Sequence, residues 1–307
     1  MYQNPPDQTL AVVIVSWNVR ELLAACLRSL LADLDRSGLE AAVWVVDNAS
    51  ADGTPGMVAA EFPAVRLIAS DENLGFAAGN NRALQAFSSS PPYIWLLNPD
   101  TEVQPGATAA LVAALESHPG AGVAGAKLLY PDGSLQQSAF RFPGLGQLAF
   151  ELFALPPRFY DSPLNGRYPQ RLYDRPTPFP VDHPLGAAMM VRAKAVARVG
   201  LLDAGYHMYC EEIDWCWRMR RAGWPALCAP AARVVHHAGQ STAQVPIPSF
   251  VNLWTSRAQL YRRYHGPLTW QIARAMVRAG MRRRMRDAPP DVAAACERII
   301  QIWSDSR

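Results

Sequence analysis

Three pairs of polar residues occur in the first hundred residues, each at the end of a short apolar run. They are Ser16 with Asn18, Asp47 with Asn48, and Asn98 with Asp100. A carboxylate at the position of Asp47 can accept hydrogen bonds from a pyrimidine ring or a ribose. One at Asp100 can hold Mg²⁺ or Mn²⁺ against a diphosphate, because hard cations prefer oxygen ligands. The alternative for both is a simple turn, which Asp-Asn and Asn-Pro-Asp sequences also favour.

An acidic cluster later in the chain offers a different chemistry. Glu211, Glu212 and Asp214 place three carboxylates within four residues, and their mutual repulsion should raise the pKa of at least one of them. A carboxyl group with a raised pKa suits a general base. Acidic residues also favour the first turn of a helix, and the sequence from Glu212 predicts a helix that stops at Gly223. The two interpretations are compatible, because a helix start can present a base into a cleft.

Two adjacent histidines, His236 and His237, follow a short apolar run. A neutral imidazole can serve as a metal ligand and would add to the carboxylate of Asp100. A histidine pair is more often structural, so both interpretations stay open.

Apolar periodicity in the first half of the chain predicts the elements that position these groups. Continuous apolar runs indicate buried strands, and apolar residues at three- and four-residue spacing indicate helices between them. The predicted strands are 10–17, 42–46, 65–69, 93–97 and 123–129, and the predicted helices are 22–31, 54–61, 75–87 and 106–117. Strands that alternate with helices imply right-handed crossovers and a mainly parallel sheet. Ligands bind at the carboxyl ends of the strands in such sheets, so the three polar pairs should line one crevice.

Composition narrows the class of protein. The chain has 307 residues, half of them hydrophobic, which suits one large domain or two ordinary ones. A net charge of only +3 does not indicate a nucleic-acid binder. Five cysteines without a C-x-x-C pair argue against a zinc site or a disulfide framework and favour a reducing cytosol. The first residues lack the features of a signal peptide, and no apolar run reaches the roughly 18 residues of a spanning helix.

An ordered set of strings points to one family. The strings are VIVSWN (13–18), VVDNASADGT (45–54), NLGFAAGNN (73–81), LLNPDTEV (96–103), GAAMMVRAKAVARVGLLD (186–203), MYCEEIDWCWRMRRAGW (208–224) and VVHHAGQS (234–241). Together they resemble glycosyltransferase family 2, the inverting nucleotide-sugar transferases with a GT-A fold. The NPD and EEIDWCWR variants are most similar to its bacterial rhamnosyltransferase-like branch, which builds cell-surface polysaccharides.

The resemblance implies an α/β fold of the GT-A (Rossmann-like) type, with a mainly parallel mixed sheet flanked by helices and a C-terminal helical tail. The glycosyltransferase domain would span 1–241, and the helical extension 242–307. The chain would transfer a sugar from a nucleoside diphosphate donor, of the dTDP-rhamnose or UDP-sugar type, to a saccharide or lipid-linked saccharide acceptor with inversion. The alternative is a non-catalytic nucleotide-sugar-binding relative or scaffold protein, which would be expected to lack Asp100 or the acidic cluster. Nucleotidyltransferases and dehydrogenases are disfavoured, because no glycine-rich phosphate loop follows the first strand.

The resemblance also implies roles for residues on the donor side. Asp47 would recognise the base of the nucleotide, with Ser16 and Asn18 in the same pocket. Asp100 occupies the last position of the family's D-x-D motif and would bind a divalent cation, Mg²⁺ or Mn²⁺. Asn98 replaces the first aspartate of that motif, which weakens the expectation of two metal-binding carboxylates. The full donor-binding set is Ser16, Asn18, Asp47, Asn48, Asn73, Gly75, Asn81, Asn98 and Asp100.

On the catalytic side, Glu212 occupies the second position of the family's E-D pair and would be the base. An aspartate is usual there, so Glu211 and Asp214 remain rivals. His236 matches a position that supplies a further metal contact in some members. The excursion 141–180, which is rich in proline, aromatic residues and arginine and is expected to be irregular, would shape the acceptor side. The residues His183, Gly186 and Ala187 would lie beside it.

The C-terminal tail contains a basic amphipathic helix. Its basic stripe is Arg274, Arg278, Arg282 and Arg286, and its apolar stripe is Ala273, Val277, Met281 and Met285. Such a helix can lie on an anionic bilayer, which would suit a cytoplasmic enzyme with a lipid-linked acceptor at the inner face of the cell membrane. In the alternative, which is the commoner outcome, the apolar stripe packs on the catalytic domain and the arginines are solvated. The helix around 292–303 also has an apolar face that would dock or dimerise.

Overall fold

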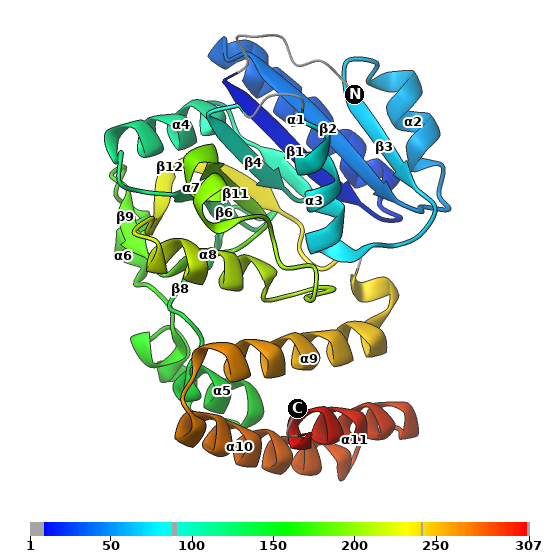
Figure 1. Ribbon diagram of the computed structural model, residues 1–307, viewed down its shortest axis with the longest axis vertical. Helices are drawn as coiled ribbons and strands as arrows, with labels where there is room; N and C mark the ends of the chain where they lie inside the picture. The colour runs from blue at the N-terminus through cyan, green and yellow to red at the C-terminus, as the bar shows by residue number, and fades with distance from the viewer. Residues whose placement is uncertain (1–8, 88–90, 241, 306–307) are drawn as a thin grey trace.

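The computed structural model describes residues 9–87, 91–240 and 242–305. Residues 1–8, 241 and 306–307, at the ends of the two expected units, lie outside the described residues. A twisted sheet with helices on both sides occupies the upper part of Figure 1, and the C-terminal helices form a separate layer below it.

The sheet is mixed, as expected, and its parallel half is N-terminal. The strands are β1 (Leu10–Ser16), β2 (Ala41–Asn48), β3 (Arg66–Ser70), β4 (Tyr93–Leu97), β5 (Thr101–Val103), β6 (Val123–Leu129), β7 (Leu135–Gln136), β8 (Ala139–Phe140), β9 (Phe179–Val181), β10 (His183–Pro184), β11 (Ala188–Arg192) and β12 (Ala226–His236). Ten of these strands form one sheet in the order β3-β2-β1-β4-β11-β6-β12-β5, with β7 beside β6 and β9 beside β12. The strands from β3 to β4 in this order are parallel, whereas β11 runs antiparallel between β4 and β6.

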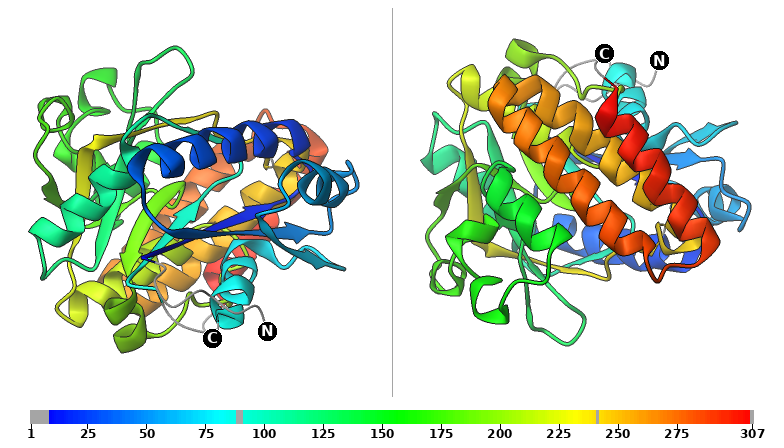
Figure 2. Two further views of the ribbon diagram at one scale, coloured as in Figure 1. Left: turned by 90° about the horizontal axis from the view of Figure 1, so that it is seen from above. Right: turned by 90° about the horizontal axis from the view of Figure 1, so that it is seen from below.

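The apolar run of β1 is explained by cores on both faces of the sheet. Leu10, Val12 and Ile14 belong to one core, and Ala11 and Val13 belong to the other. Successive side chains of a strand point to opposite faces, so a strand covered on both sides needs a continuous apolar run. Figure 2 shows the helices on the two sides of the sheet. They are α1 (Arg20–Ser37), α2 (Thr54–Glu61) and α4 (Ala107–Ser117) on one side, and α3 (Gly75–Ala86), α7 (Ala193–Val199) and α8 (Glu211–Arg221) on the other.

The stretch 141–180 is less irregular than its sequence predicts. It contains α5 (Leu145–Leu152), the 3₁₀ turns η1 (Pro157–Phe159) and η2 (Pro163–Asn165), α6 (Gln170–Tyr173) and part of β9. The expectation of irregular structure is wrong for α5, whose Leu145, Leu148 and Leu152 pack into the core of the C-terminal helices. An eight-residue helix makes only about two turns, which is too short for its apolar periodicity to stand out.

The C-terminal extension consists of the turn η3 (Thr242–Gln244) and the helices α9 (Pro246–Tyr264), α10 (Pro267–Met285) and α11 (Pro290–Ser304). The apolar stripe of α10, with Ala273, Val277 and Met281, lies in a core that is separate from both cores of the sheet. This stripe packs on α11 and on α5, and α5 belongs to the 1–241 unit, so the docking alternative holds through this one helix while α11 supplies the other partner. From the basic stripe, Arg274 donates hydrogen bonds to two backbone carbonyls at the end of α11. The apolar face of α11 is buried in the same core.

Two further observations concern the whole described chain. None of the helices that the structure describes is both long and apolar enough to cross a bilayer. All five cysteines are buried, and none forms a disulfide.

Candidate active site

A hollow of about 250 Å³, the strand-end cavity, lies at the carboxyl ends of β1, β2 and β4 and is closed by the start of α8 and the end of β12. The carboxyl ends of neighbouring parallel strands share one edge of a sheet, and this brings distant parts of the chain together. The predicted residues that line the cavity are Ser16, Asn48, Asn73, Gly75, Asn98, Asp100, Gly186, Ala187, Glu211, Glu212 and His236.

Several buried polar atoms around the strand-end cavity have no hydrogen-bond partner within the part of the chain that the structure describes. They are Ser16 Oγ, Asn48 Oδ1 and Glu211 Oε2, and Oδ1 of Asp47, which precedes Asn48 but lies outside the cavity lining, has none either. Native proteins satisfy the great majority of their buried polar atoms, and each unsatisfied one costs about 1–3 kcal/mol. A group of such atoms around one hollow indicates a site that a polar ligand completes.

Asn18 and Asp47, by contrast, do not line the strand-end cavity. Oδ1 of Asn18 accepts a hydrogen bond from the N–H of Ala51 at 2.7 Å, and Oδ2 of Asp47 accepts one from the N–H of Ser50 at 2.9 Å. The bond of Asn18 ties the loop after β1 to the loop after β2, whereas the bond of Asp47 is local to the loop after β2, as the turn interpretation of Asp47 predicts. Only the second carboxylate oxygen of Asp47 stays available for a ligand.

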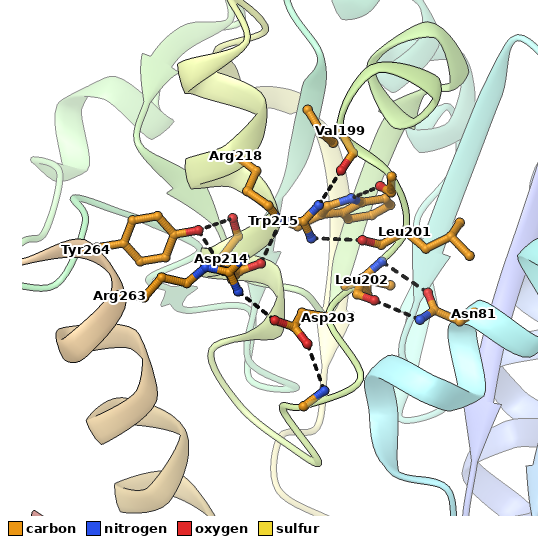
Figure 3. Close-up of polar contacts among 12 residues, drawn as sticks. Asn81, Val199, Leu201, Leu202, Asp203, Asp214, Trp215, Arg218, Arg263 and Tyr264 are labelled. Atoms are coloured by element: carbon orange, nitrogen blue, oxygen red, sulfur yellow. Dashed lines mark hydrogen bonds and ion pairs between the residues drawn. The ribbon is translucent and has the colours of Figure 1, made fainter. Parts of the chain in front are cut away.

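Asn81 also makes structural contacts outside the cavity. Its Nδ2 donates to the carbonyl of Leu202 at 2.8 Å, and its Oδ1 accepts from the N–H of Leu202 at 3.1 Å (Figure 3). This reciprocal pair holds α3 against the loop that leads to α8.

Gly75 is required where α3 begins beside the same loop. Its φ is +79°, and a Cβ at this position would overlap the backbone carbonyl of His207. The N–H of Gly75 donates to Asn73 Oδ1 at 2.9 Å, and its carbonyl accepts from Asn48 Nδ2 at 3.1 Å. Only glycine fits this left-handed conformation and close approach, so the motif residues shape the rim of the cavity through the backbone.

Backbone strain is concentrated around the site. The described non-glycine residues with positive φ are Asn18, Ala49, Tyr209, Cys210 and Ala238. All lie after strands that end near the cavity or directly before α8. Such conformations cost of order 1–3 kcal/mol each and cluster at functional sites.

Asp100 and His236 are both buried and lie side by side in the strand-end cavity. Nε2 of His236 lies 3.4 Å from Oδ1 of Asp100, and Nδ1 lies 2.7 Å from Oε1 of Gln136. An amide oxygen only accepts hydrogen bonds, so Nδ1 of His236 carries a proton and Nε2 is the ring nitrogen that faces Asp100. One oxygen and one nitrogen ligand fit a divalent cation whose other ligands come from a diphosphate and water.

His237 has a separate role. Its ring Nε2 lies 2.8 Å from Oε1 of Glu102, and its backbone N–H donates to the backbone carbonyl of Asp100 at 2.9 Å. Among the described residues there is no group of three or more His, Cys, Asp and Glu side chains placed to hold a metal ion. A cation at Asp100 and His236 would therefore depend on ligand oxygens.

The helix α8 begins with two acids that face the strand-end cavity, Glu211 and Glu212. Burial raises the pKa of Glu212 from 4.5 to about 7. Burial, and then the charge of Glu212, raise the pKa of Glu211 well above 4.5. Removal from water disfavours the charged form, and a pKa of about 7 puts Glu212 in the range where a general base works best.

Asp214 is fully buried and is not among the residues that line the strand-end cavity. Its Oδ2 accepts from Arg218 Nε at 2.7 Å, and its Oδ1 accepts from the Tyr264 hydroxyl at 2.7 Å and lies 3.1 Å from Arg263 (Figure 3). Arg218 also donates to the backbone carbonyls of Val199, the last residue of α7, and of Leu201 in the loop after it. Asp214 therefore anchors α8 and does not line the cavity.

A second hollow of about 490 Å³, the interhelix cavity, lies between α8 and the helices α5 and α9. Glu212, Tyr209 and Leu185 line both cavities. Glu212 is thus the one of the three acids that stands on the wall shared by the two hollows.

His183, expected on the acceptor side, lines the interhelix cavity. Its ring stacks with Phe140 and Phe142, at centroid distances of 5.7 and 6.1 Å. Burial lowers the pKa of His183 to about 4, so the ring is neutral at physiological pH.

Sequence reasoning missed several residues of these cavities. Tyr209 belongs to the string 208–224 but was assigned no role, and Gln136, which contacts His236 from outside both cavity linings, belongs to no motif. Leu253, Arg257 and Tyr261 line the interhelix cavity from α9. Their four-residue spacing places them on one helix face, but spacing alone does not distinguish a cavity wall from a packed core.

Comparisons with known proteins concern the family and the fold of the chain. Residues 11–200 match the model of glycosyl transferase family 2. The chain is 32% identical over 298 residues to the N-acetylglucosaminyl-diphospho-decaprenol L-rhamnosyltransferase of Mycobacterium tuberculosis (strain H37Rv), with 90% of this chain and 95% of the relative covered.

Two solved structures show the same fold. GalNAc-T7, crystallised with UDP, GalNAc and Mn²⁺, has a TM-score of 0.60 and 14% identity over 98% of this chain and 56% of that chain. The mannosyltransferase PcManGT of Pyrobaculum calidifontis, in complex with GDP-Man and Mn²⁺, has a TM-score of 0.52 and 16% identity over 98% of this chain and 72% of that chain. This likeness confirms the expected α/β fold of the GT-A type.

Proposed function

The chain belongs to glycosyl transferase family 2 and is a glycosyltransferase, and we propose that it transfers rhamnose or a related sugar from a nucleoside diphosphate donor, of the dTDP-rhamnose or UDP-sugar type, to a lipid-linked saccharide. The similarity to the mycobacterial rhamnosyltransferase supports this proposal, because it extends over nearly the full length of both chains. The name of that relative specifies both the sugar and an acceptor with a diphosphate linkage. The product would serve the synthesis of a cell-surface polysaccharide.

The observation that carries the mechanism is the position of Glu212 on the shared wall of the strand-end and interhelix cavities. A transfer needs a base that reaches the acceptor hydroxyl while the anomeric carbon of the donor lies beside it. We assign the donor to the strand-end cavity, because Asp100, His236 and the unpaired polar atoms surround that hollow. The acceptor then occupies the interhelix cavity.

Glu212 acts as the base in the proposed reaction. It removes the proton from the acceptor hydroxyl as the hydroxyl oxygen attacks the anomeric carbon. The bond from this carbon to the diphosphate breaks, the electron pair leaves with the diphosphate, and attack from the opposite side inverts the configuration. A pKa of about 7 gives Glu212 both an ionised population and adequate basicity at neutral pH. Glu211 lines only the strand-end cavity and Asp214 lines neither, so Glu212 is favoured over both.

Asp100 and His236 would hold a divalent cation, which supplies positive charge to the leaving diphosphate. Their mixed oxygen and nitrogen ligands suit Mn²⁺ better than Mg²⁺, which takes mainly oxygen ligands. Asn98 also lines this cavity and would hydrogen-bond the donor as a neutral group. The unpaired Oδ1 of Asp47 would accept a hydrogen bond from the nucleotide next to Asn48.

The extension would hold the enzyme at the cytoplasmic face of the membrane that contains its acceptor. Leu268 and Ile272 are exposed on α10, as are Arg278 and Arg282, and Arg286 is exposed directly after its end. Exposed apolar and basic side chains on one helix suit peripheral binding to anionic lipid. We expect flotation with anionic vesicles at low salt and none with neutral vesicles. Absence of flotation at low salt would contradict the membrane contact but not the transfer reaction.

Transfer assays with the full chain test the proposed function. With Mn²⁺ and dTDP-rhamnose, a short-chain lipid that carries N-acetylglucosaminyl diphosphate should gain one sugar in the inverted configuration. A thermal-shift series with dTDP-, UDP- and GDP-sugars identifies the donor, because a ligand that binds only the folded state raises the Tm. Donor binding without transfer to any acceptor would contradict the proposal and fit a non-catalytic relative or scaffold protein.

A further inference from the structure

The interhelix cavity contains two arginines, Arg167 and Arg257, that the transfer step itself does not use. We propose that Arg257, together with Arg167, binds the diphosphate of a lipid-linked acceptor. The C-terminal extension and the 141–180 stretch would then select acceptors that carry this group. The inference rests on the proposed function and adds the residues that recognise the anionic linker of the acceptor.

The cavity has the size and the walls that such an acceptor needs. Its volume of about 490 Å³ lies in the usual range of small-ligand sites. Apolar side chains, including Leu148, Phe150 and Leu253, line it together with the charged groups. A sugar placed at Glu212 therefore has its linker inside the same hollow, next to walls from α5 and α9.

Arg257 faces this hollow from α9 and keeps free hydrogen-bond donors. Its side chain is 20% exposed, and its guanidinium lies 5.0 Å from the ring centroid of Trp254. Nη2 donates to Oε1 of Glu151 on α5 at 2.6 Å, and Nη1 pairs with Oε2 of the same carboxylate. A guanidinium has five N–H groups, so a two-point pair with a carboxylate leaves three for phosphate oxygens.

Arg167 supplies a second cation to the interhelix cavity, from the 141–180 stretch. It follows η2, its side chain is 32% exposed, and its Nη1 lies 2.7 Å from Oδ1 of Asp161. His183 adds no charge, because burial lowers its pKa to about 4. The acids among the lining residues are Glu151 and Glu212. The two arginines are thus the cations that the cavity lining offers to an anion, and the planar guanidinium matches phosphate geometry.

The ion pair of Arg257 with Glu151 would also hold α9 against α5 in a purely structural role. The structural role and the binding of a diphosphate differ in whether they require Glu151. A structural ion pair needs both partners, so Arg257→Gln and Glu151→Gln would have the same effect on acceptor binding. A diphosphate site needs only the arginine, and the loss of Glu151 leaves Arg257 available to the anion.

Two acceptors test the inference. They share one sugar and one short alkyl chain, joined through a diphosphate in the first and through a neutral glycosidic bond in the second. With saturating donor and Mn²⁺, the wild type should show the lower KM for the diphosphate acceptor. Arg257→Gln should raise that KM about tenfold or more and leave the KM of the neutral acceptor within about twofold. Glu151→Gln should keep the preference, as should Arg198→Gln, which removes an exposed arginine from α7.

The outcomes separate this inference from the proposed function. Equal KM shifts for both acceptors in Arg257→Gln, or the same loss of preference in Glu151→Gln, would overturn the inference while transfer itself persists. Transfer to neither acceptor by the wild type would contradict the proposed function. Binding of a short prenyl diphosphate without sugar then decides the inference alone. It should be lost in Arg257→Gln and kept in Glu151→Gln, and equal binding by both variants would overturn it.

Discussion

Oε1 of Gln136 lies 2.7 Å from Nδ1 of His236, and Nε2 of the same ring faces Asp100 at 3.4 Å. Gln136 ends β7 and His236 ends β12, and both strands pair with β6. Because β7 and β12 are both neighbours of β6, they bring together Gln136 and His236, which are far apart in the chain. The amide holds the ring so that Nε2 faces the proposed cation site.

We expect Gln136→Ala to weaken the Mn²⁺-dependent activity about 10- to 100-fold, which is the usual effect of removing the hydrogen-bond partner of a metal-binding histidine. Titration of the activity with Mn²⁺ measures the change. Gln137→Ala is a matched control, because the side chain of Gln137 accepts a hydrogen bond from Tyr173 instead. An unaltered Mn²⁺ requirement in Gln136→Ala would show that the amide does not position His236.

Asp100→Ala should abolish metal-dependent donor binding, because it removes the oxygen ligand beside His236. Calorimetric titration of the nucleotide with and without Mn²⁺ measures this dependence. Asn98→Ala removes a polar group from the same cavity but no carboxylate, and it should keep the response to Mn²⁺. A Mn²⁺ response that persists in Asp100→Ala would count against the metal role of Asp100.

Glu212→Gln should keep donor binding and lower kcat about 10²- to 10⁴-fold, the usual contribution of a general base. In the wild type, kcat/KM should rise with pH and level off above about pH 7, because only the ionised carboxylate accepts the proton. A pH series of kcat/KM for both proteins checks this. Turnover close to that of the wild type in Glu212→Gln would rule out Glu212 as the base.

The same substitution should stabilise the fold at high pH. The pKa of Glu212 rises from 4.5 to about 7 on folding, so the folded state binds more protons than the unfolded state between these values. The wild type therefore loses stability as the pH rises through this window, by on the order of 3 kcal/mol, and Glu212→Gln avoids this loss. Urea unfolding without metal or donor should show the variant more stable than the wild type at pH 8 and similar at pH 4.5. Equal stabilities at both pH values would contradict this account of Glu212.

Asp214→Asn should act on stability more than on chemistry. It leaves Arg218 and Arg263 without a buried counter-ion and should lower the free energy of unfolding by on the order of 3 kcal/mol. Urea unfolding measures this loss. At a temperature where the variant stays folded, its kcat should fall much less than that of Glu212→Gln. A loss of turnover as large as in Glu212→Gln, with unchanged stability, would restore Asp214 as a candidate base.

Much of the fold was predictable from local patterns. The runs at 10–17 and 93–97 correspond closely to β1 and β4, and the helix predicted at 54–61 coincides with α2. The apolar stripe of α10 was also visible in the sequence, but the surface on which it packs was not. It packs on α5, a short helix of the 141–180 stretch, because burial depends on which surface is near and periodicity contains no such information.

The candidate site was predictable in its position and only partly in its details. Ser16, Asn48 and Asp100 line one cavity, as the shared edge of parallel strands requires. The side chains of Asn18 and Asn81 instead form hydrogen bonds with backbone groups of neighbouring loops. Local hydrogen bonds of this kind compete with ligand binding for the same polar atoms, and a one-dimensional pattern does not show which interaction prevails.

By itself, the sequence determined the layered α/β fold and the edge of the sheet where polar residues gather, because both follow from the spacing of apolar residues along single elements. The family resemblance favoured Glu212 and His236 in advance, and the tertiary structure adds the reason, because Glu212, and not Asp214, stands between two cavities and His236, and not His237, faces Asp100. The orientation of α8 is set by contacts of Asp214 with Arg263 and Tyr264 on α9, and that of His236 by Gln136. These contacts join segments far apart in the chain, whose mutual packing no local periodicity specifies.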